Sequence, residues 1–123
     1  MQDKEKIIII NNHIQGDPLS EENLDKTLNL VNKIRLLLPN KTIWLYTGYD
    51  FDYLFGDIKK WDKSEIIANC KREDIIRRCD VVVDGRYIDS QRNVSLRWCG
   101  SNNQRVISVQ ETLEKGEIVL WDK

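Results

Sequence analysis

Hydrophobic residues in this chain occur as three short unbroken runs and one long periodic stripe. The runs cover residues 7–10, 42–47 and 80–85 and show no polar alternation; the first is all Ile, the third contains three Val, and the second combines Ile, Trp, Leu and Tyr. Runs of this kind are typical of strands buried on both faces of a parallel sheet. We therefore predict three buried strands, the second closed by Gly48 and the third ending at Gly85.

Between the first two runs, the apolar positions follow a helical period. Ser20 is suited to an N-cap, Leu19 can pack across that cap, and Pro39 disfavours helical geometry at the residue before it. The sequence predicts a helix over residues 20–38. Its apolar stripe is formed by Leu24, Leu28, Val31, Ile34 and Leu38.

A second helix is predicted over residues 64–79, after a loop and short helix in 49–61. We expect Ile66, Ile67, Cys70, Ile75 and Ile76 to face inward and Lys71, Arg72, Arg77 and Arg78 to face solvent. Beyond residue 85 helical periodicity is lost. Residues 94–98 are consistent with a strand, and residues 106–109 and 117–121 with a late hairpin or edge strands.

This order of elements defines the expected fold class. Strand, helix and strand in succession form a right-handed βαβ unit with parallel strands. A chain of 123 residues suits one domain. We predict an α/β fold: a mostly parallel sheet with flanking helices and a short C-terminal hairpin, as a single domain over 1–123.

Charge and hydropathy exclude several classes of partner. Nineteen basic residues balance twenty acidic ones, so no long-range attraction to nucleic acid or an anionic membrane is expected. No apolar run approaches the roughly 20 residues of a membrane-spanning helix. Residues 1–6 lack the pattern of a secretion signal, and we expect a cytoplasmic protein.

The three cysteines, Cys70, Cys79 and Cys99, are widely spaced and form no C-x-x-C pair. Without an export signal they are expected to be reduced thiols, each a small buried side chain rather than a metal ligand. The only histidine, His13, has no obvious partner and is expected to be structural. The sequence therefore predicts no metal site and no catalytic residue.

Candidate chemistry lies where the predicted strands end. Ligands of parallel α/β folds bind at the carboxyl ends of the strands. Three such ends carry a glycine, and two carry a carboxylate suited to an amine, a ribose hydroxyl or a cation: residues 16–18, 47–49 and 84–86. These segments are equally consistent with tight turns of an ordinary fold, or with a small nucleotide-binding domain.

Four motifs in order carry a more specific resemblance: Gly-Asp-Pro-Leu at 16–19, Ile-Trp-Leu-Tyr-Thr-Gly-Tyr at 43–49, Val-Val-Asp-Gly-Arg-Tyr at 82–87 and Gly-Ser-x-Asn-Gln-Arg at 100–105. Together, over roughly residues 14–121, they resemble the radical S-adenosylmethionine activating protein of anaerobic ribonucleoside-triphosphate reductase. The resemblance implies a partial (β/α) barrel, equivalent to the C-terminal two-thirds of such an activase.

The resemblance also implies a function and a site. Family members hold a [4Fe–4S] cluster on a C-x-x-x-C-x-x-C loop, cleave S-adenosylmethionine and generate a glycyl radical on the reductase large subunit. By resemblance, Gly16, Asp17 and Pro18 fall on the motif that contacts the cofactor's amino group. Thr47, Asp84 and Arg86 fall at strand ends that face the cofactor or a nearby cation.

Departures from the family pattern change what this chain is expected to do. It has no cluster loop, Gln15 replaces the first glycine of a Gly-Gly-Asp-Pro motif, and Cys99 precedes Gly100 where arginine is common. We expect no [4Fe–4S] cluster on this chain and no radical generation by it alone.

Two hypotheses follow from these departures. The first is a truncated or split activase completed by another chain, which predicts an exposed apolar strand edge. The second is a non-catalytic interaction module that binds the reductase or a partner, which predicts that this edge is capped, for example by the strand at 7–10 in a homodimer.

Overall fold

The computed structural model describes residues 7–11, 16–56 and 58–121. Within them the strands are β1 (Ile7–Ile10), β2 (Thr42–Tyr46), β3 (Val81–Asp84) and β4 (Arg105–Ser108). The α-helices are α1 (Leu24–Leu37), α2 (Phe51–Leu54), α3 (Lys63–Arg77) and α4 (Val109–Lys115), and short 3₁₀ turns occupy Glu21–Asn23, Ile58–Lys60 and Asp89–Gln91.

The strands form one sheet in the order β1-β2-β3-β4. The first three run parallel, with Ile10 beside Leu45 and Leu45 beside Val82, and β4 runs antiparallel to β3. The three predicted strands and the mostly parallel α/β fold are thereby confirmed. Among the described residues the sheet is open, with β1 and β4 as its outer strands.

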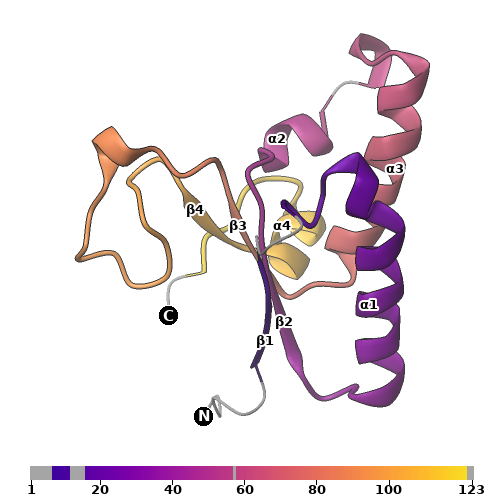
Figure 1. Ribbon diagram of the computed structural model, residues 1–123, viewed down its shortest axis with the longest axis horizontal. Helices are drawn as coiled ribbons and strands as arrows, with labels where there is room; N and C mark the ends of the chain where they lie inside the picture. Colours follow the sequence, from indigo (N-terminus) through magenta and orange to yellow (C-terminus); the bar gives the residue numbers. More distant parts are fainter. Residues whose placement is uncertain (1–6, 12–15, 57, 122–123) are drawn as a thin grey trace.

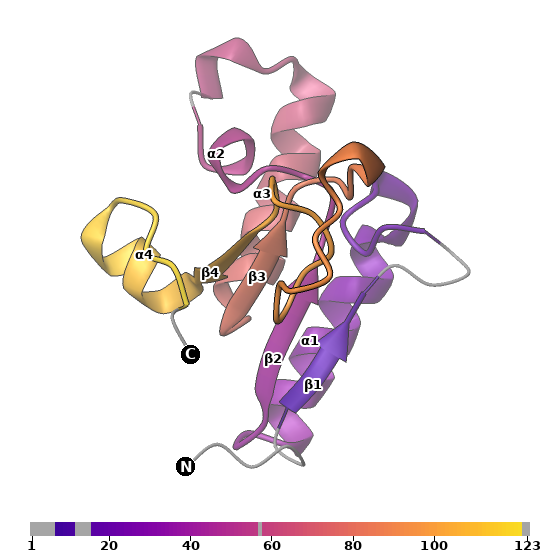
Figure 2. The ribbon, with the colours of Figure 1, turned by 90° about the vertical axis from the view of Figure 1, so that its left-hand side faces the viewer.

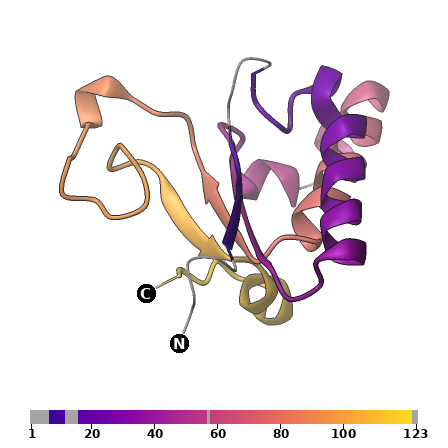
Figure 3. The same ribbon diagram turned by 60° about the horizontal axis from the view of Figure 1, so that its bottom comes forward.

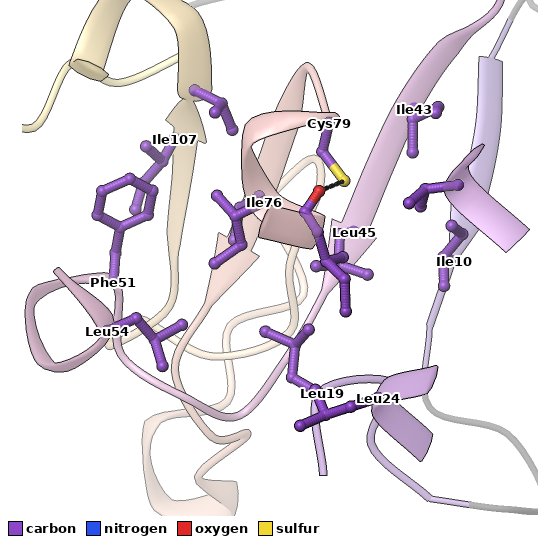
Figure 4. Packing of buried hydrophobic residues seen from close by; sticks show 14 of the residues in the cluster. Ile10, Leu19, Leu24, Ile43, Leu45, Phe51, Leu54, Ile76, Cys79 and Ile107 are labelled. Atoms are coloured by element: carbon purple, nitrogen blue, oxygen red, sulfur yellow. Dashed lines mark hydrogen bonds between the residues drawn. The ribbon is translucent and has the colours of Figure 1, made fainter. Parts of the chain in front are cut away.

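Helices α1 and α3 lie side by side and cover one face of the sheet (Figures 1 and 3). Alternate strand residues point toward them, because successive side chains of a strand lie on opposite faces. Figure 4 shows the resulting aliphatic core, which includes Ile10, Ile43, Leu45, Ile76 and Ile107. Burial of these side chains positions the strand ends at one common edge.

An aromatic cluster covers part of the opposite face. Trp44 of β2 packs against Trp98 and Trp121, with ring centroids 4.9 and 5.7 Å apart. Trp98 belongs to the long connection between β3 and β4, which passes in front of the sheet in Figure 2. Both faces of the central strands are therefore buried, and all four residues of β3 are inaccessible.

Strand β1 departs from the prediction of burial on both faces. Only Ile10 is buried, and the side chain of Ile9 is 52% exposed. Among the described residues β1 pairs with β2 alone, so its outer edge has no strand beside it. The apolar run correctly predicted a strand, but its burial depends on neighbours that the run cannot specify.

The first helix begins later than predicted. Residues Glu21–Asn23 form a 3₁₀ turn, and α1 proper starts at Leu24. Ser20 makes no side-chain cap because its hydroxyl donates to the Asp17 carbonyl oxygen at 2.9 Å. Leu38, expected in the apolar stripe, lies beyond the helix and is 45% exposed.

The inward face of α3 differs from the predicted one. Ile67 and Cys70 are exposed, whereas Arg72, expected to face solvent, is buried. The buried face is set by Ala68, Arg72, Ile75 and Ile76, at helical spacings of four, three and one. The helix starts with a capping box in which the Asp62 carboxylate accepts from the Glu65 N–H.

The C-terminal region also corrects the prediction. Residues 94–98 form no strand, and Val94 is 85% exposed. The predicted late hairpin or edge strands are present as β4 and an antiparallel bridge to Leu120, but helix α4, which ends at Gly116 with φ +72°, lies between them. The chain then returns beside β4, where the Trp121 N–H donates to the Val106 carbonyl and Ile107 forms a single bridge to Leu120.

Candidate functional site

The loops that follow β1, β2 and β3 meet at the carboxyl edge of the sheet around a cavity of about 710 Å³. This is the edge at which parallel α/β folds bind ligands. The lining combines polar groups with three tyrosine rings. It consists of Asn11, Asp17, Tyr46, Thr47, Gly48, Tyr49, Gly85, Arg86, Tyr87 and Gln104.

Asp17 joins the first two of these loops. Its Oδ1 accepts hydrogen bonds from the Leu19 N–H at 2.9 Å and the Thr47 hydroxyl at 2.8 Å, and its Oδ2 accepts from the Gly48 N–H at 2.7 Å. A Cβ atom on Gly48 would lie 3.4 Å from that Oδ2 atom. The glycine therefore lets the backbone approach the carboxylate closely.

Asp17 carries a charge that no described cation neutralises. All three of its donors are neutral groups, and it forms no ion pair among the residues that the structure describes. A carboxylate has about four lone-pair sites, so one more hydrogen bond can be accepted. Its surroundings thus favour a cationic group in the cavity.

Arg86 contributes the opposite charge. It lines the cavity with an exposed side chain, and no described residue accepts a hydrogen bond from its guanidinium. A guanidinium is a planar fork that matches a carboxylate or phosphate. The cavity lining therefore includes both a carboxylate, from Asp17, and a guanidinium, from Arg86.

The loop after β3 is held from behind by the Gly-Ser-x-Asn-Gln-Arg segment. The Asn103 side chain donates to the Arg86 carbonyl at 2.7 Å, and the Gln104 side chain donates to the Gly85 carbonyl at 3.0 Å. Gly85 has φ +95°, which favours glycine. Gly100 lies beneath the Tyr87 ring, where a Cβ atom would come within 3.0 Å. This segment shapes the cavity wall.

A buried arginine supports the wall formed by Tyr49. Arg72 donates to the Leu19 carbonyl at 2.7 Å, to Asn69 Oδ1 at 2.8 Å and to the Tyr49 hydroxyl at 3.1 Å. Its guanidinium carbon also lies 4.3 Å from the centre of the Tyr49 ring. Sequence periodicity missed this role, because two of the three acceptors, Leu19 and Tyr49, come from distant loops.

Asp84, predicted to face a cofactor or cation, lies outside the cavity lining. It is 1% exposed, and both of its oxygens are bound by Arg105, at 3.1 Å to Oδ1 and 2.6 Å to Oδ2. Oδ2 also accepts from the Phe51 N–H at 2.8 Å. The carboxylate raises the pKa of Arg105 above its usual range. Arg105 had no sequence-based role beyond its motif.

The remaining predicted site residues take supporting positions. Gly16 has φ +88° and Pro18 is buried, its carbonyl accepting from the Thr27 hydroxyl at 2.8 Å. Neither lines the cavity. The structure thus brings Asp17, Thr47 and Arg86 together and places the other predicted residues around them. Gln15 and His13 lie outside the described residues.

The cysteines do not fit an iron–sulfur cluster. Cys70 is exposed on α3, whereas Cys79 is buried in the core, where its thiol donates to the Ile75 carbonyl (Figure 4). Burial raises the pKa of Cys79 from 9.0 to about 12 and also raises that of Cys99. In the part of the chain that the structure describes, no three His, Cys, Asp or Glu side chains gather to hold a metal ion. Cluster ligation requires deprotonated thiolates around one position.

Comparison with known protein families gives the class to which this chain belongs. The chain belongs to the family described as "4Fe-4S single cluster domain", whose pattern matches residues 4–107. Its relatives within that class are anaerobic ribonucleoside-triphosphate reductase-activating proteins. The protein of Escherichia coli K12 is 35% identical over 91 residues, covering 74% of this chain and 50% of the relative.

Two further relatives extend this comparison. The activating protein of Enterobacteria phage T4 is 35% identical over 95 residues (76% of this chain, 49% of the relative). That of Vibrio cholerae is 36% identical over 89 residues (72% and 48%). The chain therefore spans about half the length of these relatives. The family membership argues against an unrelated nucleotide-binding domain.

No solved structure is significantly similar to this chain. Among the described residues, no helix is both long and apolar enough to span a membrane.

Proposed function

We propose that this chain supplies the S-adenosylmethionine-binding cavity of an activating protein for anaerobic ribonucleoside-triphosphate reductase. The observation that carries the proposal is the un-neutralised Asp17 carboxylate at the cavity, within the first of four motifs in family order. The relatives named above are activating proteins of that reductase. The proposal places the protein in the cytoplasm, with the reductase large subunit as partner.

The cavity offers complementary groups for each part of the cofactor. Asp17 can accept a hydrogen bond from the methionine ammonium group, and the Arg86 guanidinium can pair with the methionine carboxylate. The rings of Tyr46, Tyr49 and Tyr87 provide flat walls against which an adenine can pack. When bound, S-adenosylmethionine supplies a sulfonium centre that is open to reductive cleavage.

The proposal assigns the cluster to residues other than Cys70, Cys79 and Cys99. It therefore includes a complementing chain or segment for glycyl-radical formation, and assigns no radical step to the residues described. In this arrangement the sheet is part of a (β/α) barrel that the complementing part completes. The exposed Ile9 and the open edge of β1 support such a completion.

Isothermal titration calorimetry with S-adenosylmethionine tests the binding function. Wild type is expected to bind one equivalent saturably without iron, and Asp17→Asn and Arg86→Met are each expected to weaken binding about tenfold. The matched controls Asp25→Asn and Arg77→Met alter exposed charges on α1 and α3 and should bind as wild type does. Absence of binding to the folded wild-type protein would refute the proposal.

The cysteine arrangement favours a second function, that of a non-catalytic module binding the reductase. Anaerobic reconstitution with iron and sulfide, carried out without and then with the complementing part, separates the two. Both functions predict no cluster absorbance on this chain alone. Only the first predicts cluster-dependent cleavage of S-adenosylmethionine after the complementing part is added.

A further inference from the structure

Asp84 and Arg105 form a directly opposed pair across the β3–β4 ladder, where their Cα atoms are register partners. The guanidinium binds both carboxylate oxygens, through Nε to Oδ1 at 3.1 Å and through Nη2 to Oδ2 at 2.6 Å. The Asp84 side chain is 1% exposed, whereas that of Arg105 is 32% exposed. A buried carboxylate is thus paired with a cation that solvent can still reach.

This pair connects three of the segments that line the cavity, at residues 47–49, 85–87 and 104. Asp84 directly precedes Gly85 and Arg86, and Arg105 directly follows Gln104. Asp84 Oδ2 also accepts from the N–H of Phe51, the first residue of α2, at 2.8 Å. The segment before Phe51 contains Thr47, Gly48 and Tyr49. Arg105 extends the connection to α2 with a 3.3 Å contact to Asp52.

Loss of the guanidinium would leave Asp84 buried without a counterion. An uncompensated buried charge is unfavourable, so the carboxylate would have to move toward water or take up a proton. Movement would release the Phe51 N–H and protonation would weaken its hydrogen bond, so either change loosens the backbone on both sides of the cavity. The effect would reach Tyr49 and Arg86 although neither touches Arg105 in the structure.

We propose that Arg105 is a positioning residue of the cavity. Its guanidinium is the built-in counterion of Asp84, and through this ion pair the three connected segments keep the geometry that binds the ligand. Asp84 then needs no cation from solution. The ligand-affinity part of this inference rests on the proposed function, whereas the wall-ordering part does not.

The test uses Arg105→Ala in the full chain, with guanidinium ion as a chemical replacement. Hydrogen exchange followed by mass spectrometry reports the order of residues 47–51 and 85–87, and calorimetry reports S-adenosylmethionine affinity. Arg105→Ala is expected to lose protection in those two segments and to bind at least about tenfold more weakly. Guanidinium at millimolar concentration, well below denaturing levels, should restore both.

Two further variants keep the inference falsifiable. Arg105→Lys retains the charge without the bidentate fork and should lie between wild type and Arg105→Ala. Asp84→Asn/Arg105→Gln removes both charges, should fold, and should not respond to guanidinium. If wild type fails to bind S-adenosylmethionine, the proposed function fails, and exchange alone still decides this inference.

Two outcomes would overturn it. The first is native protection in residues 47–51 and 85–87 of Arg105→Ala. The second is a loss of protection that extends evenly through α1 and β1 and does not return with guanidinium, which would indicate a merely structural role.

Discussion

Asp17 and Asp84 both stand near the end of a parallel strand, yet the structure uses their charges in opposite ways. The hydrogen bonds that Asp17 accepts from described residues all come from neutral donors, at the edge of an open cavity. Asp84 is buried against Arg105, which engages both of its oxygens. Motif position alone does not separate the two aspartates, whereas the presence of a protein counterion does. This difference supports the proposed roles, ligand binding for Asp17 and positioning for Asp84.

The largest expected effect comes from removing the counterion. Arg105→Met leaves a buried charge unpaired and is expected to lower the free energy of unfolding by about 3 kcal/mol. Asp84→Asn should cost less, because the remaining guanidinium is partly exposed and can be hydrated. Urea denaturation monitored by tryptophan fluorescence measures both. Equal losses in the two variants would contradict the asymmetry between a buried carboxylate and an accessible cation.

Asp17→Asn is expected to lose little stability but much ligand affinity, in contrast to the large loss of stability in Arg105→Met. Its unfolding free energy should fall by about 1 kcal/mol, as for a lost or weakened hydrogen bond. Its affinity for S-adenosylmethionine should fall about tenfold, because the charge that faces the cavity is gone. If Asp17→Asn unfolds as readily as Arg105→Met, the main role of Asp17 is to stabilise the fold and not to bind ligand. Asp25→Asn is the control for loss of an exposed carboxylate.

Thr47 makes a smaller contribution to the same wall. Thr47→Val removes the hydroxyl that donates to Asp17 and accepts from the Tyr49 N–H. The expected cost is about 1 kcal/mol of stability, with a severalfold loss of affinity. Thr47→Ser retains the hydroxyl and should preserve binding. A loss of binding in Thr47→Ser that is absent in Thr47→Val would show that the methyl group, and not the hydrogen bond, matters.

Thiol reactivity gives the smallest but most specific prediction. With an aromatic disulfide reagent under native conditions, Cys70 should react first, Cys99 slowly and Cys79 only on unfolding. Mass spectrometry of the labelled peptides measures the order of reaction. Fast labelling of Cys79 would contradict its burial.

The raised pKa of Cys79 also predicts a pH dependence. The folded pKa of Cys79, about 12, lies above the unfolded value. The contribution of the buried neutral thiol to the free energy of unfolding is therefore fully present below about pH 9 and is lost as the pH rises from 9 toward 12. Urea titrations across this range, with Cys79→Ala as the reference, measure it. A reference that shows the same pH dependence would assign the effect to another group.

Local patterns predicted the elements better than their environments. Buried β-branched runs located β1, β2 and β3, because a strand with both faces covered needs no polar alternation. The exposure of Ile9 was missed because it depends on which elements pack beside β1, and the apolar run does not specify them. In the tail, edge pairing was predicted correctly for β4 and the residues around Leu120, but α4 between them was missed, although Gly116 is the kind of residue that ends a helix.

The site was predicted in part for the same reason. Asp17, Thr47 and Arg86 follow directly from the rule that strand ends converge. Arg72 and Arg105 were missed because their partners, Leu19 and Asp84, are far away in the sequence. A basic residue on a helix or after a loop carries no local sign that its charge is buried or paired.

The most direct test of the account is calorimetric titration of iron-free protein with S-adenosylmethionine, comparing wild type with Asp17→Asn and Asp25→Asn. The account predicts saturable binding of one equivalent by wild type and Asp25→Asn, and about tenfold weaker binding by Asp17→Asn. Equal affinity in all three proteins, or no binding by folded wild type, would contradict it.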